Sequence, residues 1–190
     1  MQQFICVYCG AANHLASIYV ETARDLGRRI AERGHALVYG GANRGLMGEV
    51  ARTANDHGAQ VIGVIPQVLV KLEQAYQAAD DLIITDGLRE RKAVMESRAT
   101  AFVGLAGGLG TFDELFEALT HRQLLLHNKP IVLIDTDGFY QPFVRLIEHI
   151  HERGFVKDTY KKLFTIVPDP AAAIDYIEAY EPVEIESRFT

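Results

Sequence analysis

The strongest constraint on the fold is a regular alternation of short apolar runs with longer segments of helical periodicity. Most of the apolar runs are continuous rather than interleaved with polar residues, as in strands that are buried on both faces of a sheet. This alternation predicts an α/β fold with a doubly wound, mostly parallel sheet and helices on both faces. The predicted strands span residues 4–9, 36–41, 60–65, 81–85, 101–106, 130–135 and 163–167.

Helices are predicted in the segments between these strands. The first is expected to start from an N-cap at Ser17 and to end near Gly34, because apolar residues recur at helical spacing between them. With 190 residues and no linker or repeat, we expect a single domain over residues 1–180, followed by an exposed tail over 181–190. The other predicted helices span residues 45–57, 88–99, 112–126, 139–152 and 170–179.

Charge and hydropathy exclude two classes of partner. The formal net charge is −6 and no basic block occurs, so the cationic surface that binds nucleic acid is not expected. No apolar run approaches the ~20 residues of a membrane span, so no membrane partner is expected. The segment "MQQFICVYCG" lacks the charged and apolar regions of a signal peptide, which indicates a cytoplasmic protein.

Two cysteines, Cys6 and Cys9, form a C-x-x-C pattern that can indicate redox chemistry. In a buried strand, however, their Cα atoms would lie roughly 10 Å apart and the side chains would point to opposite faces. A disulfide needs Cα atoms within about 7 Å of each other. We therefore expect two buried thiols rather than a redox pair.

Three glycine-rich loops follow predicted strands: "CGAAN" (9–13), "GGANRGLMG" (40–48) and "GGLGT" (107–111). In a doubly wound sheet, ligands bind beyond the carboxyl ends of the strands. One such loop is weak evidence, because a tight strand-to-helix turn requires glycine anyway. Three of them at one edge of the sheet indicate a ligand site.

The third loop has the features of a phosphate site. Gly107, Gly108 and Gly110 would let the backbone approach an anion, Thr111 adds a hydroxyl, and the first N–H groups of the following helix would point at the ligand. The spacing matches neither the dinucleotide fingerprint G-x-G-x-x-G nor the P-loop G-K-[ST]. The prediction of phosphate binding therefore rests on the glycines, the hydroxyl and the helix N–H groups, and not on either of these motifs.

Glu114 has two interpretations that its spacing leaves open. Thr111 and Glu114 fit the capping box T-x-x-E, in which the glutamate bonds back to the threonine N–H. Alternatively, Glu114 is a reactive carboxylate beside the phosphate site. The segment "RERKAVMESR" (89–98) supplies opposite charge, because Arg91 and Lys92 follow a predicted strand and would lie at the same edge. The seven histidines show no ligand spacing, so no metal site is expected.

These motifs together resemble the LOG family, the cytokinin riboside 5′-monophosphate phosphoribohydrolases, also called "lysine decarboxylase-like" proteins. The similarity runs from "VYCGAA" through "LVYGGANRGLMGEVA" and "RERKAVM" to "AGGLGTFDELFEALT". It implies a modified Rossmann fold, a homodimer, no cofactor and hydrolysis of a nucleoside 5′-monophosphate to free base and ribose 5-phosphate. It assigns Arg91 and Glu114 as the catalytic pair and assigns substrate contacts to Lys92, Gly107, Gly108, Leu109, Gly110, Thr111, Thr120 and Glu73.

The chain departs from the family pattern at several positions around the site. Ala106 replaces a proline, Ala42 replaces a glycine, Leu88-Arg89 stand where Met-His is common, and Thr100 stands where aspartate is frequent. These changes leave the preferred base open. A non-catalytic carrier of a nucleotide or of molybdopterin cofactor is the alternative function. Lysine decarboxylation is disfavoured, because no lysine stands in a recognisable pyridoxal phosphate motif.

Overall fold

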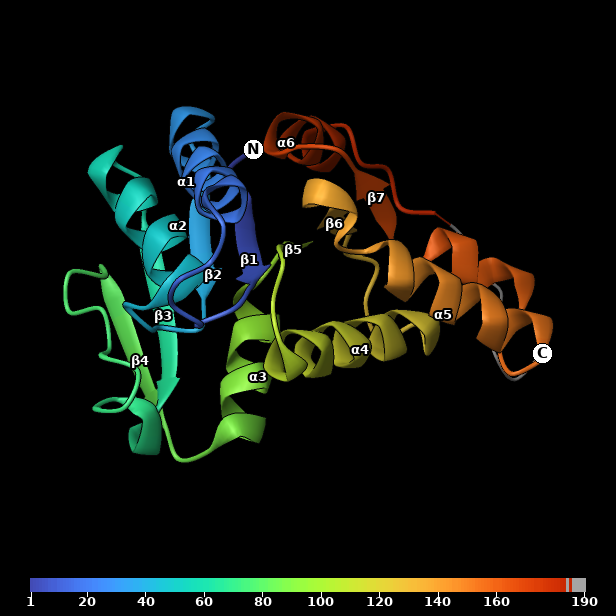
Figure 1. Cartoon of the computed structure of the whole chain (residues 1–190), viewed down its shortest axis with the longest axis horizontal. Helices are drawn as coiled ribbons and strands as arrows, with labels where there is room; N and C mark the ends of the chain where they lie inside the picture. Colours follow the sequence, from blue (N-terminus) through green and yellow to red (C-terminus); the bar gives the residue numbers. More distant parts are fainter. Residues whose placement is uncertain (184, 186–190) are drawn as a thin grey trace.

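The sheet of the computed structural model, which describes residues 1–183 and 185, confirms the predicted fold class (Figure 1). Seven parallel strands lie in the order β4-β3-β2-β1-β5-β6-β7. The central strands β1, β2, β3, β5 and β6 are buried because helices cover both faces, which explains their continuous apolar sequences, whereas the edge strand β4 is partly exposed. Their bounds are β1 (Phe4–Tyr8), β2 (Ala36–Tyr39), β3 (Val61–Pro66), β4 (Asp81–Thr85), β5 (Ala101–Gly104), β6 (Ile131–Ile134) and β7 (Thr165–Val167).

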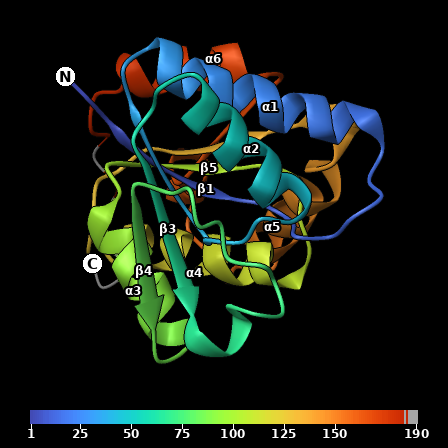
Figure 2. The ribbon, with the colours of Figure 1, turned by 90° about the vertical axis from the view of Figure 1, so that its left-hand side faces the viewer.

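Helices α1, α2 and α6 lie on one face of the sheet, and α3 and α4 lie on the other (Figures 1 and 2). No helix in the described part of the chain has the length and apolar character to cross a membrane. The α-helices are α1 (Ser17–Glu32), α2 (Gly45–Asp56), α3 (Leu88–Arg98), α4 (Leu109–Gln123), α5 (Gln141–Glu152) and α6 (Pro170–Glu178); short 3₁₀ turns are η1 (Gln67–Leu69), η2 (Thr136–Gly138) and η3 (Asp158–Lys162).

Each face of the sheet has its own apolar core, and β1 contributes alternately to both. Ile5 and Val7 pack with α1, α2 and α6, whereas Cys6 and Tyr8 pack with α3, α4 and α5. Cys9, directly after β1, belongs to the first core, so the two thiols are buried on opposite faces and both are free. The expectation of two structural thiols is confirmed.

The topology places a crevice between β1 and β5. From β1 the chain winds outward through β2, β3 and β4, and then returns to β5 on the other side of β1. The loops that follow β1 and β5 therefore diverge toward opposite faces, and the space between them is where ligands bind in sheets of this kind. The first and third glycine loops flank this switch point.

Three local predictions differ from the structure. The N-cap of α1 is Ala16, with no side-chain cap, and Ser17 is the first helical residue. Helix α4 begins at Leu109 rather than at residue 112, so Thr111 lies inside the first turn and the predicted capping box is wrong. In the predicted tail, residues 181–183 are exposed but Ile185 is buried against the second core; residues 184 and 186–190 lie outside the described residues.

Candidate active site

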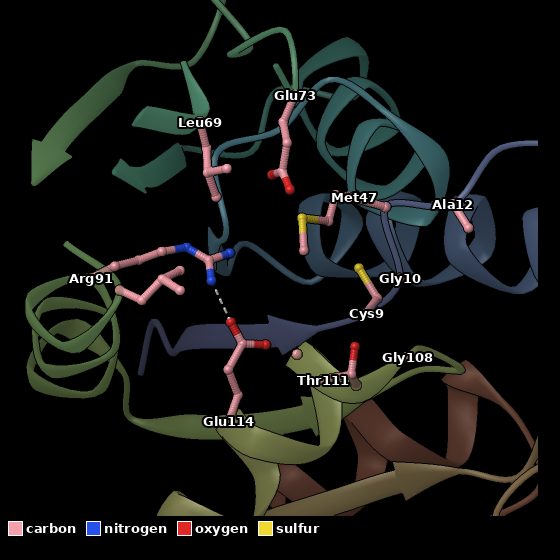
Figure 3. A pocket seen from close by; sticks show the side chains of 13 residues that line it. Cys9, Gly10, Ala12, Met47, Leu69, Glu73, Arg91, Gly108, Thr111 and Glu114 are labelled. Atoms are coloured by element: carbon pink, nitrogen blue, oxygen red, sulfur yellow. Dashed lines mark hydrogen bonds and ion pairs between the residues drawn. The ribbon is translucent and has the colours of Figure 1, made fainter. Parts of the chain in front are cut away.

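A cavity of about 370 Å³ opens at the carboxyl edge of the sheet, over the switch point (Figure 3). Its lining comes from the loops that follow β1, β3 and β5, from the first turns of α2 and α3 and from the first two turns of α4. Segments far apart in the sequence therefore meet at one site. The lining residues are Cys9, Gly10, Ala11, Ala12, Met47, Leu69, Glu73, Leu88, Arg91, Gly108, Gly110, Thr111 and Glu114.

The three glycine loops are bonded to one another by their backbones. The Gly10 N–H donates to the Ala106 carbonyl at 3.1 Å, and the Leu46 N–H donates to the Gly10 carbonyl at 2.9 Å. A Cβ atom at Gly107 would collide with the Thr111 side chain and lie 2.9 Å from the Gly10 nitrogen. Gly107 is thus required for loop packing, and it is not among the residues that line this cavity.

The N-terminus of α4 faces the cavity with its backbone. Gly108 is the N-cap and no side chain caps the helix, so the first-turn N–H groups remain available for a ligand. A Cβ atom at Gly108 or Gly110 would meet nothing within 4 Å. This open space beside free N–H groups, together with the positive end of the helix dipole, suits an anion such as phosphate.

Arg91 and Glu114 form a buried ion pair on the wall of the cavity. The Arg91 Nη1 donates to Glu114 Oε1 at 2.7 Å, and the residues are 6% and 4% exposed. Arg91 Nε also donates to the Val64 carbonyl at 3.0 Å, and Nη2 donates to the Gly40 carbonyl at 3.3 Å. A Cβ atom at Gly40 would collide with the guanidinium. The second glycine loop therefore makes room for Arg91 rather than for the ligand.

Burial controls the charge of Glu114. Removal from water raises the pKa of its carboxyl to about 7. The positive charge of Arg91 and the hydrogen bond that Arg91 donates both lower this pKa, but by less than burial raises it. Asp113 raises the pKa further and Lys92 lowers it. Glu114 can therefore exchange a proton near neutral pH, as a general base must. Burial raises the pKa of the Cys9 thiol far above neutrality, so Cys9 is not a thiolate nucleophile.

Glu73 reaches into the cavity from the side opposite Glu114 (Figure 3). Its Oε2 atom is shielded from solvent and has no hydrogen-bond partner. The segment that carries it is held to the second glycine loop by two backbone bonds, from the Asn43 N–H to the Gln74 carbonyl and from the Tyr76 N–H to the Gly41 carbonyl, each 2.9 Å long. An unpaired carboxylate oxygen in this position can accept a hydrogen bond from a ligand.

Four of the residues nominated from the sequence do not line the cavity. Lys92 pairs with Asp113 at 2.9 Å and with Glu117, both on α4. Thr120 donates its hydroxyl to the Phe116 carbonyl and lies roughly 13 Å along α4 from Thr111. Gly107 packs closely against Thr111 and Gly10, and Leu109 is 91% exposed. The structure brings Arg91, Glu114, Gly108, Gly110, Thr111 and Glu73 together around the cavity.

Sequence reasoning did not nominate the apolar residues Met47, Leu69 and Leu88 as site residues. All three line the cavity, and Figure 3 shows Leu69 and Met47 on the same side of it as Glu73. Met47 belongs to the second glycine loop region, which the motifs placed at the ligand edge. Leu69 lies in η1 and carries no motif, so only the tertiary structure reveals it.

One group of side chains outside the cavity could hold a metal ion. Among the described residues, Glu96, Glu117 and His121 place ligand atoms within 4.8 Å of one another. The cavity lining itself offers two carboxylates, Glu73 and Glu114, of which Glu114 is paired with Arg91.

An open helix N-terminus that suits an anion and a buried titratable pair, both at the switch point of a parallel sheet, define a Rossmann-like protein with a candidate ligand site. Comparison with known proteins makes the assignment specific. A family model described as "Possible lysine decarboxylase" matches residues 47–177. The cytokinin riboside 5′-monophosphate phosphoribohydrolase LOG of Oryza sativa is 40% identical, with coverage of 94% of this chain and 74% of that protein. The chain belongs to this family, the LOG family.

Further relatives agree in sequence and in structure. The LOG2 phosphoribohydrolase of Arabidopsis thaliana is 36% identical over 94% of this chain and 84% of its own length. Among solved structures, the molybdenum cofactor carrier protein of Chlamydomonas reinhardtii is similar with a TM-score of 0.73 and 26% identity, over 94% of this chain and 97% of that chain. The same fold thus occurs in proteins described as enzymes and as carriers.

Proposed function

We propose that the protein hydrolyses the N-glycosidic bond of nucleoside 5′-monophosphates, of the cytokinin or adenine type, to free base and ribose 5-phosphate. The observation that carries this proposal is the buried Arg91–Glu114 pair, which lies one helical turn beyond the open glycine loop. An anion site alone serves binding as well as catalysis. A buried carboxylate beside it adds a group that can stabilise positive charge on the sugar and orient the attacking water.

The two parts of the site suit the two ends of the sugar phosphate. The N-terminus of α4, with Gly108, Gly110 and Thr111, takes the 5′-phosphate. The ribose then lies over Glu114, three residues further along the helix. Departure of the base builds positive, oxocarbenium-like charge on the ribose, and the Glu114 carboxylate stabilises that charge and orients the attacking water.

Arg91 keeps Glu114 in position and lowers the energy of its ionised form. Its guanidinium is itself fixed by two backbone carbonyls, so the carboxylate is presented in one orientation. Without that cation, burial would raise the pKa of Glu114 further and leave it protonated at neutral pH. The Glu114 carboxylate is therefore poorly solvated, yet the charge of Arg91 stabilises it enough for it to ionise near neutral pH.

The base lies at the far end of the cavity, against Met47, Leu69 and Leu88. Apolar walls suit the faces of a purine ring, and the free oxygen of Glu73 can accept a hydrogen bond from an N–H group of the base or a hydroxyl of the ribose. The names of the rice and Arabidopsis relatives favour a cytokinin nucleotide. Plain AMP shares the purine and the sugar phosphate that the cavity would contact.

A carrier of a nucleotide or of molybdopterin cofactor is the second candidate. The similarity to the Chlamydomonas carrier, which extends over nearly the whole chain, favours it. A carrier has no need of a buried carboxylate at the sugar, so the Arg91–Glu114 pair favours the enzyme. The higher sequence identity to the phosphoribohydrolases points the same way.

We also propose that the enzyme acts as a homodimer in the cytoplasm and without nucleic acid. Two exposed leucines support self-association: Leu88, 55% exposed, lines the cavity, and Leu109, 91% exposed, stands in the phosphate loop. The negative net charge opposes nucleic-acid binding. Light scattering coupled to size exclusion measures the oligomer, and a monomeric mass would contradict the dimer.

Incubation with AMP and with isopentenyladenosine 5′-monophosphate, followed by chromatography of the released base, tests the function. Release of base from either substrate is expected, and the ratio of the two rates identifies the preferred base. Tight binding of both nucleotides without release would overturn the hydrolase in favour of the carrier.

A further inference from the structure

Glu96, Glu117 and His121 gather three metal-binding side chains where α3 meets α4, outside the cavity. Their ligand atoms lie within 4.8 Å of one another. We propose that this cluster binds a divalent transition-metal ion such as Zn²⁺, at a site that is separate from the proposed hydrolysis. Imidazole and carboxylate ligands are the donor set that Zn²⁺ and its neighbours in the first transition row accept in proteins.

The helices present these ligands from two sides. Glu117 and His121 are four residues apart on α4 and share one face of that helix. Glu96 comes from α3, and both of its oxygens lie close to His121 Nδ1, at 2.9 and 2.8 Å. In the metal-free protein this contact is a hydrogen bond or ion pair. A metal ion would take the place of the hydrogen that Glu96 and His121 share.

Neighbouring groups hold the ligands but do not themselves ligate. His127 uses both ring nitrogens on the backbone: Nε2 donates to the Ala118 carbonyl at 3.1 Å, and Nδ1 accepts from the Lys129 N–H at 3.2 Å. Its Nε2 also lies 3.9 Å from Glu96 Oε1. Lys129 Nζ donates to the Glu96 carbonyl at 2.7 Å. Such outer contacts orient metal ligands, and water is left to complete the coordination.

The local charge and exposure admit a cation. The side chains of Glu96, Glu117 and His121 are 20%, 31% and 32% exposed, so the cluster is open to solvent on one side. Lys92 now pairs with Glu117, but it also pairs with Asp113 at 2.9 Å. Lys92 can therefore keep a carboxylate partner when Glu117 turns to a metal ion.

Binding at this site would tie α3 to α4. These helices carry Arg91 and Glu114, so the ion would stabilise the scaffold of the cavity without entering it. The proposal predicts a rise in the unfolding temperature with Zn²⁺, because a ligand that binds the folded state selectively stabilises it. It predicts no metal requirement for base release.

Calorimetric titration of Zn²⁺ into chelator-treated, full-length protein tests the site. We expect one ion per chain, and binding at least about 10-fold weaker in His121→Gln, which keeps an amide toward Glu96 but removes the imidazole. Glu96→Gln should weaken binding in the same way. His149→Ala, which removes an exposed imidazole from α5, is the matched control and should leave the affinity unchanged.

Co²⁺ gives a second readout, because its visible absorption depends on the ligands and geometry around the ion and should change when His121→Gln removes the imidazole. Equal Zn²⁺ affinity in the wild type and His121→Gln would overturn the proposal, as would an equal loss in His149→Ala or the absence of binding to the wild type. Base release by the chelator-treated enzyme is measured in parallel. If the chelator-treated enzyme releases no base, the proposed hydrolase activity is contradicted. The metal titrations test only the metal site.

Discussion

At the scale of single residues, the site depends on the balance that sets the charge of Glu114. Burial disfavours the carboxylate, while Arg91 attracts it through a 2.7 Å hydrogen bond. Burial is the larger influence, since the pKa is raised to about 7 despite the arginine. A carboxylate in a solvent-exposed ion pair would instead have a pKa below its ordinary value. Glu114 makes no cap hydrogen bond to α4, and its raised pKa suits the reactive role proposed above.

Replacing the Glu114 carboxylate with an amide should separate binding from chemistry. In Glu114→Gln the phosphate contacts at the N-terminus of α4 remain, but neither the ribosyl charge nor the attacking water meets a carboxylate. We expect the rate of base release to fall by at least about 10²-fold, with the Kd for AMP within a few-fold of the wild type. Chromatography and calorimetry provide the two numbers. Undiminished release would contradict the catalytic role.

The pH dependence of kcat/KM should report the pKa of Glu114 in the free enzyme. If the ionised form is the active one, kcat/KM rises about tenfold per pH unit below pH ~7 and levels off above it. Arg91→Lys weakens the attraction that favours ionisation and should move this acid limb to higher pH. An acid limb centred near the ordinary glutamate value of 4.5 would show that a different group is titrating.

At the scale of elements, α4 carries both halves of the proposed chemistry. Its N-terminus offers backbone N–H groups, its next turn carries Glu114, and Lys92 of α3 is bonded to Asp113 and Glu117 along it. Lys92 therefore acts on the position of the helix rather than inside the cavity. Since the loop and the carboxylate belong to one rigid element, their separation is fixed by the helix itself.

A side chain at Gly108 should block the phosphate site. The Cβ position is open in the free protein, so Gly108→Val folds without collision, but its methyl groups would occupy the space beside the N–H groups. We expect AMP affinity to fall by about tenfold or more, which calorimetry measures. Gly87→Val, at an equally open N-cap on α3 that does not line the cavity, is the control. Unchanged affinity in Gly108→Val would refute the loop assignment.

The contact between α1 and α2 should be sensitive to one methyl group. A Cβ atom at Gly27 would lie 2.5 Å from the Val50 carbonyl oxygen and 3.0 Å from the Ala54 nitrogen, both backbone atoms that cannot rotate away. Gly27→Ala should lower the free energy of unfolding by about 1–3 kcal/mol, as read from denaturant titration. Glu21→Ala, on the exposed side of α1, should have little effect. Equal stability of the two variants would contradict close packing here.

At the scale of the whole molecule, the sequence predicts the helices and strands, because these elements depend on local periodicity. All seven strands and six α-helices appear within a few residues of their expected ranges, because a buried strand and an amphipathic helix each leave a pattern in consecutive residues. The predicted start of α4, residue 112, is three residues too late because the first turn holds Gly110 and the exposed Leu109, which give no amphipathic signal.

The site was predictable only where it coincides with a motif. Arg91, Glu114 and the glycine loop stand in the family signatures. Leu69 and Leu88 line the cavity only because the tertiary structure brings η1 and α3 to the same edge of the sheet as the start of α4. Likewise, the Lys92 side chain pairs with Asp113 of α4 rather than lining the cavity because of how α3 packs on α4. The metal-ligand cluster joins Glu96 to His121 across 25 residues, a separation that no spacing rule covers.

The stability of the whole protein should carry the signature of the same buried carboxyl. The folded-state pKa of Glu114, about 7, lies above the ordinary value of 4.5 that applies to the unfolded chain. Between these values the folded state binds more protons than the unfolded state, so the Glu114 contribution to the free energy of unfolding falls as pH rises. The total fall from Glu114 is on the order of 3 kcal/mol across this range.

Other carboxylates change stability in the same pH range, so the measurement must be a difference. Glu114→Gln removes the titration but leaves the remaining carboxylates in place, and its constant cost from an unpaired Arg91 does not vary with pH. The free energy of unfolding of the wild type minus that of Glu114→Gln, from urea titrations between pH 4.5 and 7.5, should therefore decrease as pH rises. If this difference increased with pH instead, the effect of Arg91 on the pKa of Glu114 would outweigh that of burial, and Glu114 would be ionised well below neutrality. Glu114 could then no longer transfer a proton near pH 7, but its carboxylate could still stabilise the ribosyl charge.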